Sequence, residues 1–522
     1  MPEGRPLFPR SSGILLHPTS LPGPDGIGDL GDAAFGFVDW LEKTGQSLWQ
    51  ILPLGPTSFG DSPYQTLSAF AGNPLLISLD RLVRDGWLAP ADLQRRPDFP
   101  ADRVDFGAVI NWKTTMLARA WTVFQERAGR RHQAEFAAWC ADQEGWLDDF
   151  ALFMALKQDN AGAAWTDWEP GLAARAEPSL AAARERLAGS LAEHRFRQWL
   201  FFTQWQELKA FAAARGIRFI GDIPIFVAQD SSDVWAHRDL FQLDRAGRPT
   251  SVAGVPPDYF SDTGQLWGNP LYDWERLRQT DYAWWLQRIT ACLESVDLVR
   301  LDHFRGFEAC WEVPAGDETA ENGRWVAGPG SDFFDTLTAA LDGRLPLIAE
   351  DLGVITPAVE NLRRKYALPG MKVLQFAWSG PDNAFLPHEH EQNCVVYAGT
   401  HDNDPVLGWW RHLADAATKD FVADYAGYPA DEPHWTLIRL GMRSSGHTFI
   451  ATMQDILGLG REGRMNLPGE GKGNWDWRMP ATAFTCSGGD RLAHLTWLYR
   501  RRPDQAAAGS QDPDTPAKGP GV

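Results

Sequence analysis

The chain has 522 residues, which is enough for one large barrel with insertions or for several smaller domains. Its 68 acidic against 49 basic residues give a formal charge of −19, and because such a surface repels polyphosphates we expect no nucleic-acid partner. The five cysteines lack metal-ligand spacing, and no apolar run reaches the roughly 18 residues of a membrane span. The start lacks a secretion signal, so we expect a cytoplasmic protein that does not bind membranes.

Eight short apolar segments along the chain are predicted to be strands. They cover residues 13–17, 48–54, 217–227, 296–302, 345–350, 371–378, 394–400 and 449–456. Helical patterns separate most of them, as over 356–366, where Thr356 can cap a helix that begins with Pro357. Strands that alternate with helices favour a parallel sheet, and eight of them favour an α/β fold of the closed (β/α)8 type, the TIM barrel.

Two connections are too long to be simple turns. Residues 76–215 are predicted to form a mainly helical insertion, with periodicity clearest over 109–129, 133–159 and 180–214 and with Gly216 as a stop. Residues 228–282 are rich in Pro, Gly, Asp and aromatics and show little periodicity, so they are predicted to be an irregular aromatic lid. We therefore expect one catalytic domain over 1–503, followed by a disordered tail over 504–522.

Several tryptophans stand beside polar loop residues. Among the 25 Trp of the chain, Trp267 and Trp475 have amide and carboxylate neighbours in the sequence. Flat rings next to hydrogen-bonding side chains suit sugars, which have apolar faces and polar rims, although most single tryptophans belong to a core. This composition is compatible with a carbohydrate ligand.

Three predicted strands are apolar until they end in an acidic residue. Asp302 and Glu350 end their segments directly, and Asp402 follows shortly after the third. Parallel barrels place their chemistry at the carboxyl ends of strands, so these three carboxylates are predicted to meet at one mouth. Such a set is typical of sugar-bond chemistry, in which one carboxylate attacks and another donates a proton.

Each carboxylate has a predicted role and an alternative. Arg300 lies two residues before Asp302, on the same strand face, and a guanidinium favours the ionised form that a nucleophile requires; the alternative is a structural ion pair. Glu350 follows four apolar residues, whose surroundings would raise the pKa of its carboxyl group and so suit a general acid. The alternative is that Glu350 or Asp351 caps a nearby turn. Asp402 is predicted to grip sugar hydroxyls, unless its loop is merely solvated or holds a cation.

A fourth strand-end acid, Asp222, either binds substrate or supports the pair of Arg300 and Asp302. The residues alone favour glycoside chemistry but do not separate transfer to a sugar from transfer to water. A magnesium-dependent barrel that abstracts protons, with Lys372 nearby, is a further alternative, although Arg300 would repel a cation. A protein that binds glycans without catalysing a reaction is the remaining alternative.

Long blocks of the sequence resemble a known family. They are SGILLHPTSLPGPDGIGDLG, QILPLGPTSFGDSPYQ, GDIPIFVA, GVPPDYFSDTGQLWGNPLY, VRLDHFRGFEACWEVPAG, IAEDLG, GTHDND and RMNLPG. Over residues 12–477 the chain resembles the amylomaltases, which are 4-α-glucanotransferases (disproportionating enzymes) related to the α-amylases. The resemblance implies a (β/α)8 barrel with inserted subdomains and no C-terminal β-domain, no metal or organic cofactor, and maltodextrins or amylose as substrate.

The resemblance also implies a retaining mechanism and a set of contacts. Asp302 would form the covalent glycosyl intermediate, Glu350 would act as acid and then base, and Asp402 would stabilise the transition state. The implied substrate contacts are Arg300, His401, Asp222, Tyr64, Asp351, Ser62, Asn466 and, in the lid, Tyr259, Phe260, Gln265 and Trp267.

Three positions depart from the family pattern, namely Phe59, Pro405 and Thr452. Phe59 lies in a region linked in the family to a second glucan-binding site. None of the three is one of the catalytic carboxylates. We therefore expect the chemistry to be kept, with any change falling on acceptor preference or product size.

Overall fold

The computed structural model describes residues 9–257, 261–485 and 488–502. The predicted tail over 504–522 and the expected lid contacts Tyr259 and Phe260 lie outside the described residues, as does the side chain of Phe59. Within the described part, no helix has the length and apolar character needed to cross a membrane.

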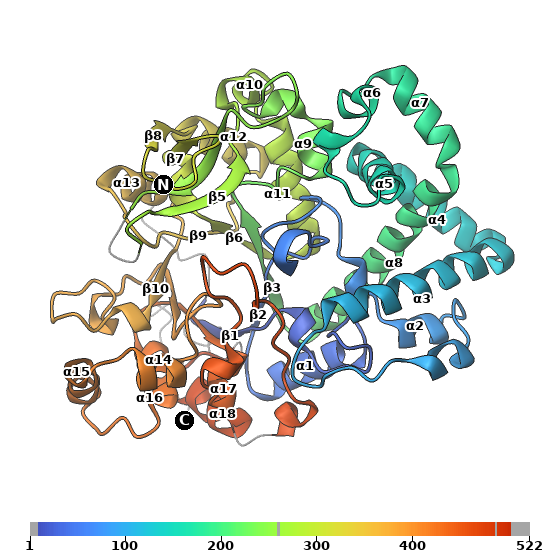
Figure 1. Ribbon diagram of the computed structural model, residues 1–522. Coiled ribbons are helices and arrows are strands. Elements are labelled where there is room, and N and C mark those ends of the chain that lie inside the picture. Colours follow the sequence, from blue (N-terminus) through green and yellow to red (C-terminus); the bar gives the residue numbers. More distant parts are fainter. Residues whose placement is uncertain (1–8, 258–260, 486–487, 503–522) are drawn as a thin grey trace, which may run out of the picture.

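The centre of the molecule is a parallel sheet of eight strands (Figure 1). The strands are β1 (Ser11–Leu15), β2 (Leu48–Gln50), β3 (Arg218–Pro224), β6 (Leu298–Asp302), β9 (Leu347–Ala349), β10 (Gly370–Val373), β11 (Cys394–Tyr397) and β12 (Thr448–Thr452). They are ordered β10-β11-β12-β1-β2-β3-β6-β9, and a hydrogen bond of 2.9 Å from the Ala349 N–H to the Pro369 carbonyl joins the two ends. The predicted barrel and all eight strands are confirmed; β1 lies two residues earlier than predicted, and the other seven strands are shorter than predicted.

Helices surround the barrel and fill the long connections. They are α1 (Asp32–Lys43), α2 (Leu79–Arg84), α3 (Phe106–Arg127), α4 (Arg130–Asp142), α5 (Glu144–Asp159), α6 (Pro170–Ala173), α7 (Glu177–Arg186), α8 (Ala188–Ala213), α9 (Ser232–Ala236), α10 (Trp274–Gln279), α11 (Ala283–Ser295), α12 (Gly330–Ala340), α13 (Pro357–Lys365), α14 (Val406–His412), α15 (Ala416–Ala426), α16 (Pro433–Arg443), α17 (Met453–Leu457) and α18 (Gly488–Leu498). After β12, residues 453–485 and 488–502 hold helices and turns but no strand.

Local signals explain several helix ends. Thr356 caps α13 by accepting the Val359 N–H, with Pro357 in the first turn, as the sequence predicts. Gly216 follows α8 in the left-handed region at φ +70°. The predicted strand over 449–456 instead ends at Thr452, because the Thr452 side chain accepts the Asp455 N–H and starts α17.

The connection between β2 and β3 holds α2 to α8, which lie together on one side of the barrel (Figure 1). The periodic stretch 133–159 is two helices rather than one, because Gln143 interrupts it with φ −97° and ψ 10°. The stretch 180–214 is likewise divided at Leu187. The helix before β3, α8, packs against β3 and α1 and so serves as a barrel helix.

A second sheet stands at the carboxyl end of the barrel. Its antiparallel strands are ordered β5-β4-β7-β8, with bounds β4 (Ser251–Val255), β5 (Gln265–Pro270), β7 (Ala309–Pro314) and β8 (Arg324–Ala327). The expectation that 228–282 is irregular is therefore wrong for β4, β5, α9 and α10. Gly254, Gly268 and Pro270 interrupt the alternation that would have indicated strands. Because this sheet is built from the chain that leaves β3 and β6, it lies beside the end of β6.

The strand interiors form the core. Ile14, Trp49, Ile220 and Ile348 are fully buried. Neighbouring strands approach closely at Gly13, where an added Cβ would lie 2.3 Å from the Leu48 carbonyl oxygen. The barrel therefore requires glycine at this position.

We expect Gly13→Ala to lower the free energy of unfolding by about 1–3 kcal/mol, because the methyl group would have to displace β2 backbone. Chemical denaturation measures the effect. The matched control is Gly36→Ala in α1, where an added Cβ meets nothing within 4 Å, so a gain of about 0.5–1 kcal/mol is expected. Equal effects of the two substitutions would contradict the close packing of β1 on β2.

Candidate active site

Four acidic residues gather at the carboxyl end of the barrel. Asp222 lies in β3 and Asp302 ends β6, while Glu350 follows β9 and Asp402 follows β11. The parallel register of β3 and β6 places Asp222 opposite Arg300. The sheet alone therefore brings these side chains from distant parts of the sequence to one end of the fold.

Arg300 joins two of the carboxylates. Its Nη1 donates to the Asp222 oxygens at 2.7 and 2.9 Å, and its Nη2 lies 2.7 Å from Asp302 Oδ1. Arg300 is 4% exposed and Asp222 5%. Burial raises the pKa of Asp222, although Arg300 opposes the shift. The expectation that Arg300 and Asp302 lie side by side is met, and Asp222 supports the pair from the other side of the guanidinium.

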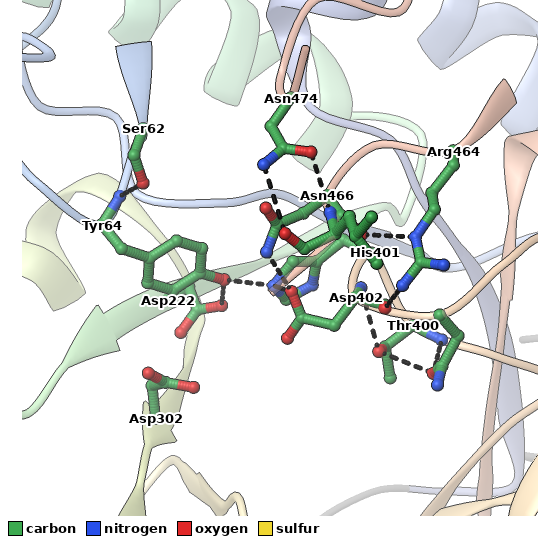
Figure 2. Close-up of polar contacts among 12 residues, drawn as sticks. Ser62, Tyr64, Asp222, Asp302, Thr400, His401, Asp402, Arg464, Asn466 and Asn474 are labelled. Atoms are coloured by element: carbon green, nitrogen blue, oxygen red, sulfur yellow. Dashed lines mark hydrogen bonds and ion pairs between the residues drawn. The ribbon is translucent and has the colours of Figure 1, made fainter. Parts of the chain in front are cut away.

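Tyr64 and His401 extend this network toward Asp402 (Figure 2). The Tyr64 hydroxyl donates to Asp222 Oδ2 at 2.8 Å and lies 2.9 Å from His401 Nε2. Because its single proton goes to Asp222, the His401 Nε2–H must be the donor in the second contact. Burial lowers the pKa of His401, which favours the neutral ring. His401 Nε2 is also 3.4 Å from Asp402 Oδ1.

Two neighbours hold Tyr64 in place. The Ser62 hydroxyl oxygen accepts the Tyr64 backbone N–H at 3.2 Å, which fixes the turn that carries the phenol (Figure 2). Trp475 packs against both Tyr64 and His401, with ring centroids 5.7 and 6.0 Å away. Ser62 thus acts on the site through the turn, whereas Trp475 forms part of its wall.

Glu350 occupies a different environment from Asp302. Burial, followed by the negative charge of Asp302, raises the pKa of Glu350 to about 8. Its oxygens accept the backbone N–H groups of Leu352 at 2.9 Å and His303 at 2.7 Å, which favour the ionised form but do not outweigh burial. The hydrogen bond from Leu352 shows that Glu350 also caps the turn, which was the alternative to a general acid. Both features hold, because the pKa of Glu350 is raised despite this bond.

Asp402 is held from one side and open on the other. Asn466 Nδ2 donates to Asp402 Oδ1 at 2.6 Å, and Arg464 Nη2 donates to the Asp402 carbonyl at 2.7 Å (Figure 2). The Asp402 side chain remains 42% exposed, against 28% for Asp302. This side chain is therefore positioned by the protein and still accessible to a ligand.

Asp404 and Arg464 are functional neighbours that the sequence did not reveal. Asp404 pairs with Arg464 Nη1 at 2.6 Å and with Arg461 Nε at 2.8 Å, so it is not free to hold a cation. Across the described ranges, no group of three or more His, Cys, Asp or Glu side chains is arranged to bind a metal. Only the proximity of Arg464 to Asn466 in the RMN block pointed to its role.

The second sheet brings Trp267 to the site. Its ring meets the His303 ring edge-on, with centroids 4.8 Å apart, directly after Asp302 in the chain. Trp267 Nε1 donates to Gln265 Oε1 at 3.3 Å, so the two expected lid contacts lie together.

Asp351 forms its contacts away from Arg300 and the four acidic residues described above. Its oxygens accept the Met371 N–H at 2.7 Å and lie 3.2 Å from Arg363 Nε, beneath β10. An added Cβ on Gly370 would lie 2.2 Å from this carboxylate. The structure therefore places Asp351 as a link between β9, β10 and α13, in contrast to the substrate contact that the resemblance implies.

The carboxylates act on shared neighbours. Burial raises the pKa of Tyr64, and the charges of Asp222, Asp302 and Asp402 add to the rise. Asp302 also raises the pKa of Glu350. These shared effects are consistent with three carboxyl groups that lie within electrostatic reach of one another.

We expect Glu350→Gln to increase thermal stability by a margin that grows with pH. Folding raises the pKa of Glu350 from 4.5 to about 8, so the native carboxyl holds its proton more tightly than the unfolded one. The wild type therefore loses stability as pH rises between these values, whereas the Gln variant does not. Melting temperatures measured from about pH 4 to pH 9 test this, with the exposed Glu126→Gln on α3 as control. A margin that is constant over this range, or equal to the control's, would contradict the raised pKa.

Comparisons with known proteins agree with this geometry. A family model described as 4-alpha-glucanotransferase matches residues 16–483. The 4-alpha-glucanotransferases of Synechocystis sp. and Thermus thermophilus are each 50% identical to the chain, over 94% and 95% of it and 98% and 99% of their own lengths. A solved amylomaltase from Streptococcus agalactiae, in complex with acarbose, aligns with a TM-score of 0.91 at 39% identity, covering 94% of this chain and 100% of that one. The resemblance is confirmed, and the chain belongs to the 4-alpha-glucanotransferase family.

Proposed function

We propose that Asp302, Glu350 and Asp402 transfer α-1,4-glucan segments from a maltodextrin to another glucan or to glucose, with retention of configuration. The observation that supports these roles best is the contrast between two adjacent carboxyl groups. Asp302 is paired with Arg300 at 2.7 Å, whereas burial and the charge of Asp302 raise the pKa of Glu350 to about 8. An ionised nucleophile beside a protonated acid is what the first step needs.

In the first step, an Asp302 oxygen attacks the anomeric carbon and the glycosidic bond breaks. Glu350 gives its proton to the departing oxygen, and the reducing-end part of the donor leaves as an alcohol. In the second step, Glu350 takes the proton of an acceptor hydroxyl, which attacks the anomeric carbon and releases Asp302. Both steps balance without any other reactant.

Asp402 stabilises the charged ring that forms in both steps. Its accessible carboxylate is held by Asn466 at 2.6 Å, so it can accept hydrogen bonds from two sugar hydroxyls without reorganising. His401 lies beside Asp402 and Tyr64 beside His401, so in this proposal both contact the same sugar ring. The Streptococcus agalactiae relative is described as binding acarbose, which supports an oligosaccharide at this site.

Transfer to sugar rather than to water is the activity of the family. The second sheet supports it, because Trp267 packs on His303 next to the nucleophile. An aromatic wall there shields the covalent intermediate from water and offers a surface on which an acceptor ring can stack.

We infer a cytoplasmic location for this activity. Four cysteines, Cys140, Cys292, Cys310 and Cys394, carry free thiols. Unpaired thiols are typical of proteins in a reducing compartment.

Maltotriose is the substrate that separates transfer from hydrolysis. We expect the purified protein to convert it to glucose plus a ladder of longer oligomers, with the number of reducing ends unchanged, because every bond broken is matched by one formed. Chromatography and a reducing-sugar assay measure both quantities. A steady rise in reducing ends without longer products would identify an α-glucan hydrolase instead.

A further inference from the structure

A cavity lies away from the strand ends, where the helical connection meets the barrel helices. It has a volume of about 260 Å³ and is bounded by α4, α5, α8, α11 and the loop that follows Tyr64. Six of its lining residues are Phe70, Trp139, Gln143, Trp146, Phe202 and Gln206, and we call it the aromatic groove. None of the candidate catalytic residues lines it.

The aromatic rings of the groove form one cluster. Phe70 and Trp146 are nearly parallel, with an interplanar angle of 13° and centroids 6.4 Å apart. Phe202 contacts Trp139 and Trp146, with centroids at 5.8 and 6.0 Å. All four side chains remain partly accessible. Large rings gathered beside an open cavity offer flat apolar surfaces of the kind on which a sugar ring stacks.

Polar groups surround these rings. The Trp146 indole N–H donates to Gln143 Oε1 at 2.9 Å, which orients the Gln143 amide. Thr203, Gln206 and Glu294 are exposed at the rim. The lining residues, all within the described part of the chain, include neither Lys nor Arg. Amide, hydroxyl and carboxylate groups suit a neutral polyol, whereas a phosphate or other anion would find no cation here.

The groove is large enough to admit a sugar ring. Its volume of about 260 Å³ is many times the roughly 10–15 Å³ that a cavity needs to hold one water. A smaller cavity of about 90 Å³ shares Phe70 and Phe202 with the groove and is also lined by residues 221–224 of β3.

We propose that the aromatic groove is a further binding site for α-1,4-glucan, separate from the active site and lined by none of the residues around Phe59. This inference rests on the proposed function for the chemistry of its ligand. A glucan held there is tethered to the enzyme, which raises the effective concentration of its other segments at the catalytic carboxylates. Long and branched glucans gain from the groove, and maltotriose does not.

Electrophoresis through native gels that contain glycogen tests the proposal. All proteins carry Asp302→Asn, which prevents turnover and leaves active-site binding the same throughout. We expect Trp139→Ala combined with Trp146→Ala to weaken the apparent affinity for glycogen by about tenfold. The matched control is Trp497→Ala, since Trp497 on α18 is 52% exposed and does not line the groove. The retardation of this variant by glycogen should be unchanged.

A second variant covers the case in which the double substitution fails to fold. Thr203→Trp fills the groove from an exposed position on α8 and should weaken glycogen binding to a similar degree.

Unchanged retardation of the folded groove variants, or an equal loss with Trp497→Ala, would overturn the proposal. In the catalytically intact background, the groove variants should disproportionate maltotriose at the wild-type rate. Failure of the unmodified protein to do so would instead contradict the proposed function.

Discussion

Arg300 is a buried guanidinium shared between Asp222 and Asp302, and the rest of the site is organised around it. Removing one member of a buried charge pair costs about 3–5 kcal/mol, because the partner keeps an uncompensated charge. The contacts of 2.7 Å to both carboxylates therefore fix the ends of β3 and β6 relative to each other. From Asp222 the hydrogen bonds continue through Tyr64 to His401, so Asp302 and the loop that carries Asp402 are held by one network.

Three carboxyl groups of similar intrinsic acidity are differentiated by their surroundings. Glu350 has apolar walls and a negative neighbour, and its pKa rises to about 8. Asp302 has a cation at 2.7 Å. Asp402 is the most accessible of the three, and Arg464 and Asn466 determine its position. The roles that we propose, proton donation, attack and charge stabilisation, would thus be divided among identical chemical groups by burial and by pairing.

Sequence patterns predicted the barrel and its acidic strand ends because both depend on local features. Apolar runs indicate buried strands, and a single acidic residue at the carboxyl end of such a strand indicates an active site rather than a core position. The second sheet was missed because glycine and proline interrupt its strands, whose pairing depends on partners as distant as Gly254 and Trp311. The partners of Asp351 depend on tertiary contacts that no spacing along the chain indicates, and for Arg464 the only sign in the sequence is its closeness to Asn466.

In the proposed mechanism, Asp302 forms a covalent bond to the sugar, and Glu350 first donates and then accepts the proton. The most direct measurement is mass spectrometry of peptides from Glu350→Gln after brief incubation with α-maltosyl fluoride, whose leaving group needs no acid. We expect the peptide that contains Asp302 to carry a maltosyl group, because the base that would activate an acceptor is missing. A label on another residue, or none while fluoride is released in a burst, would contradict the account.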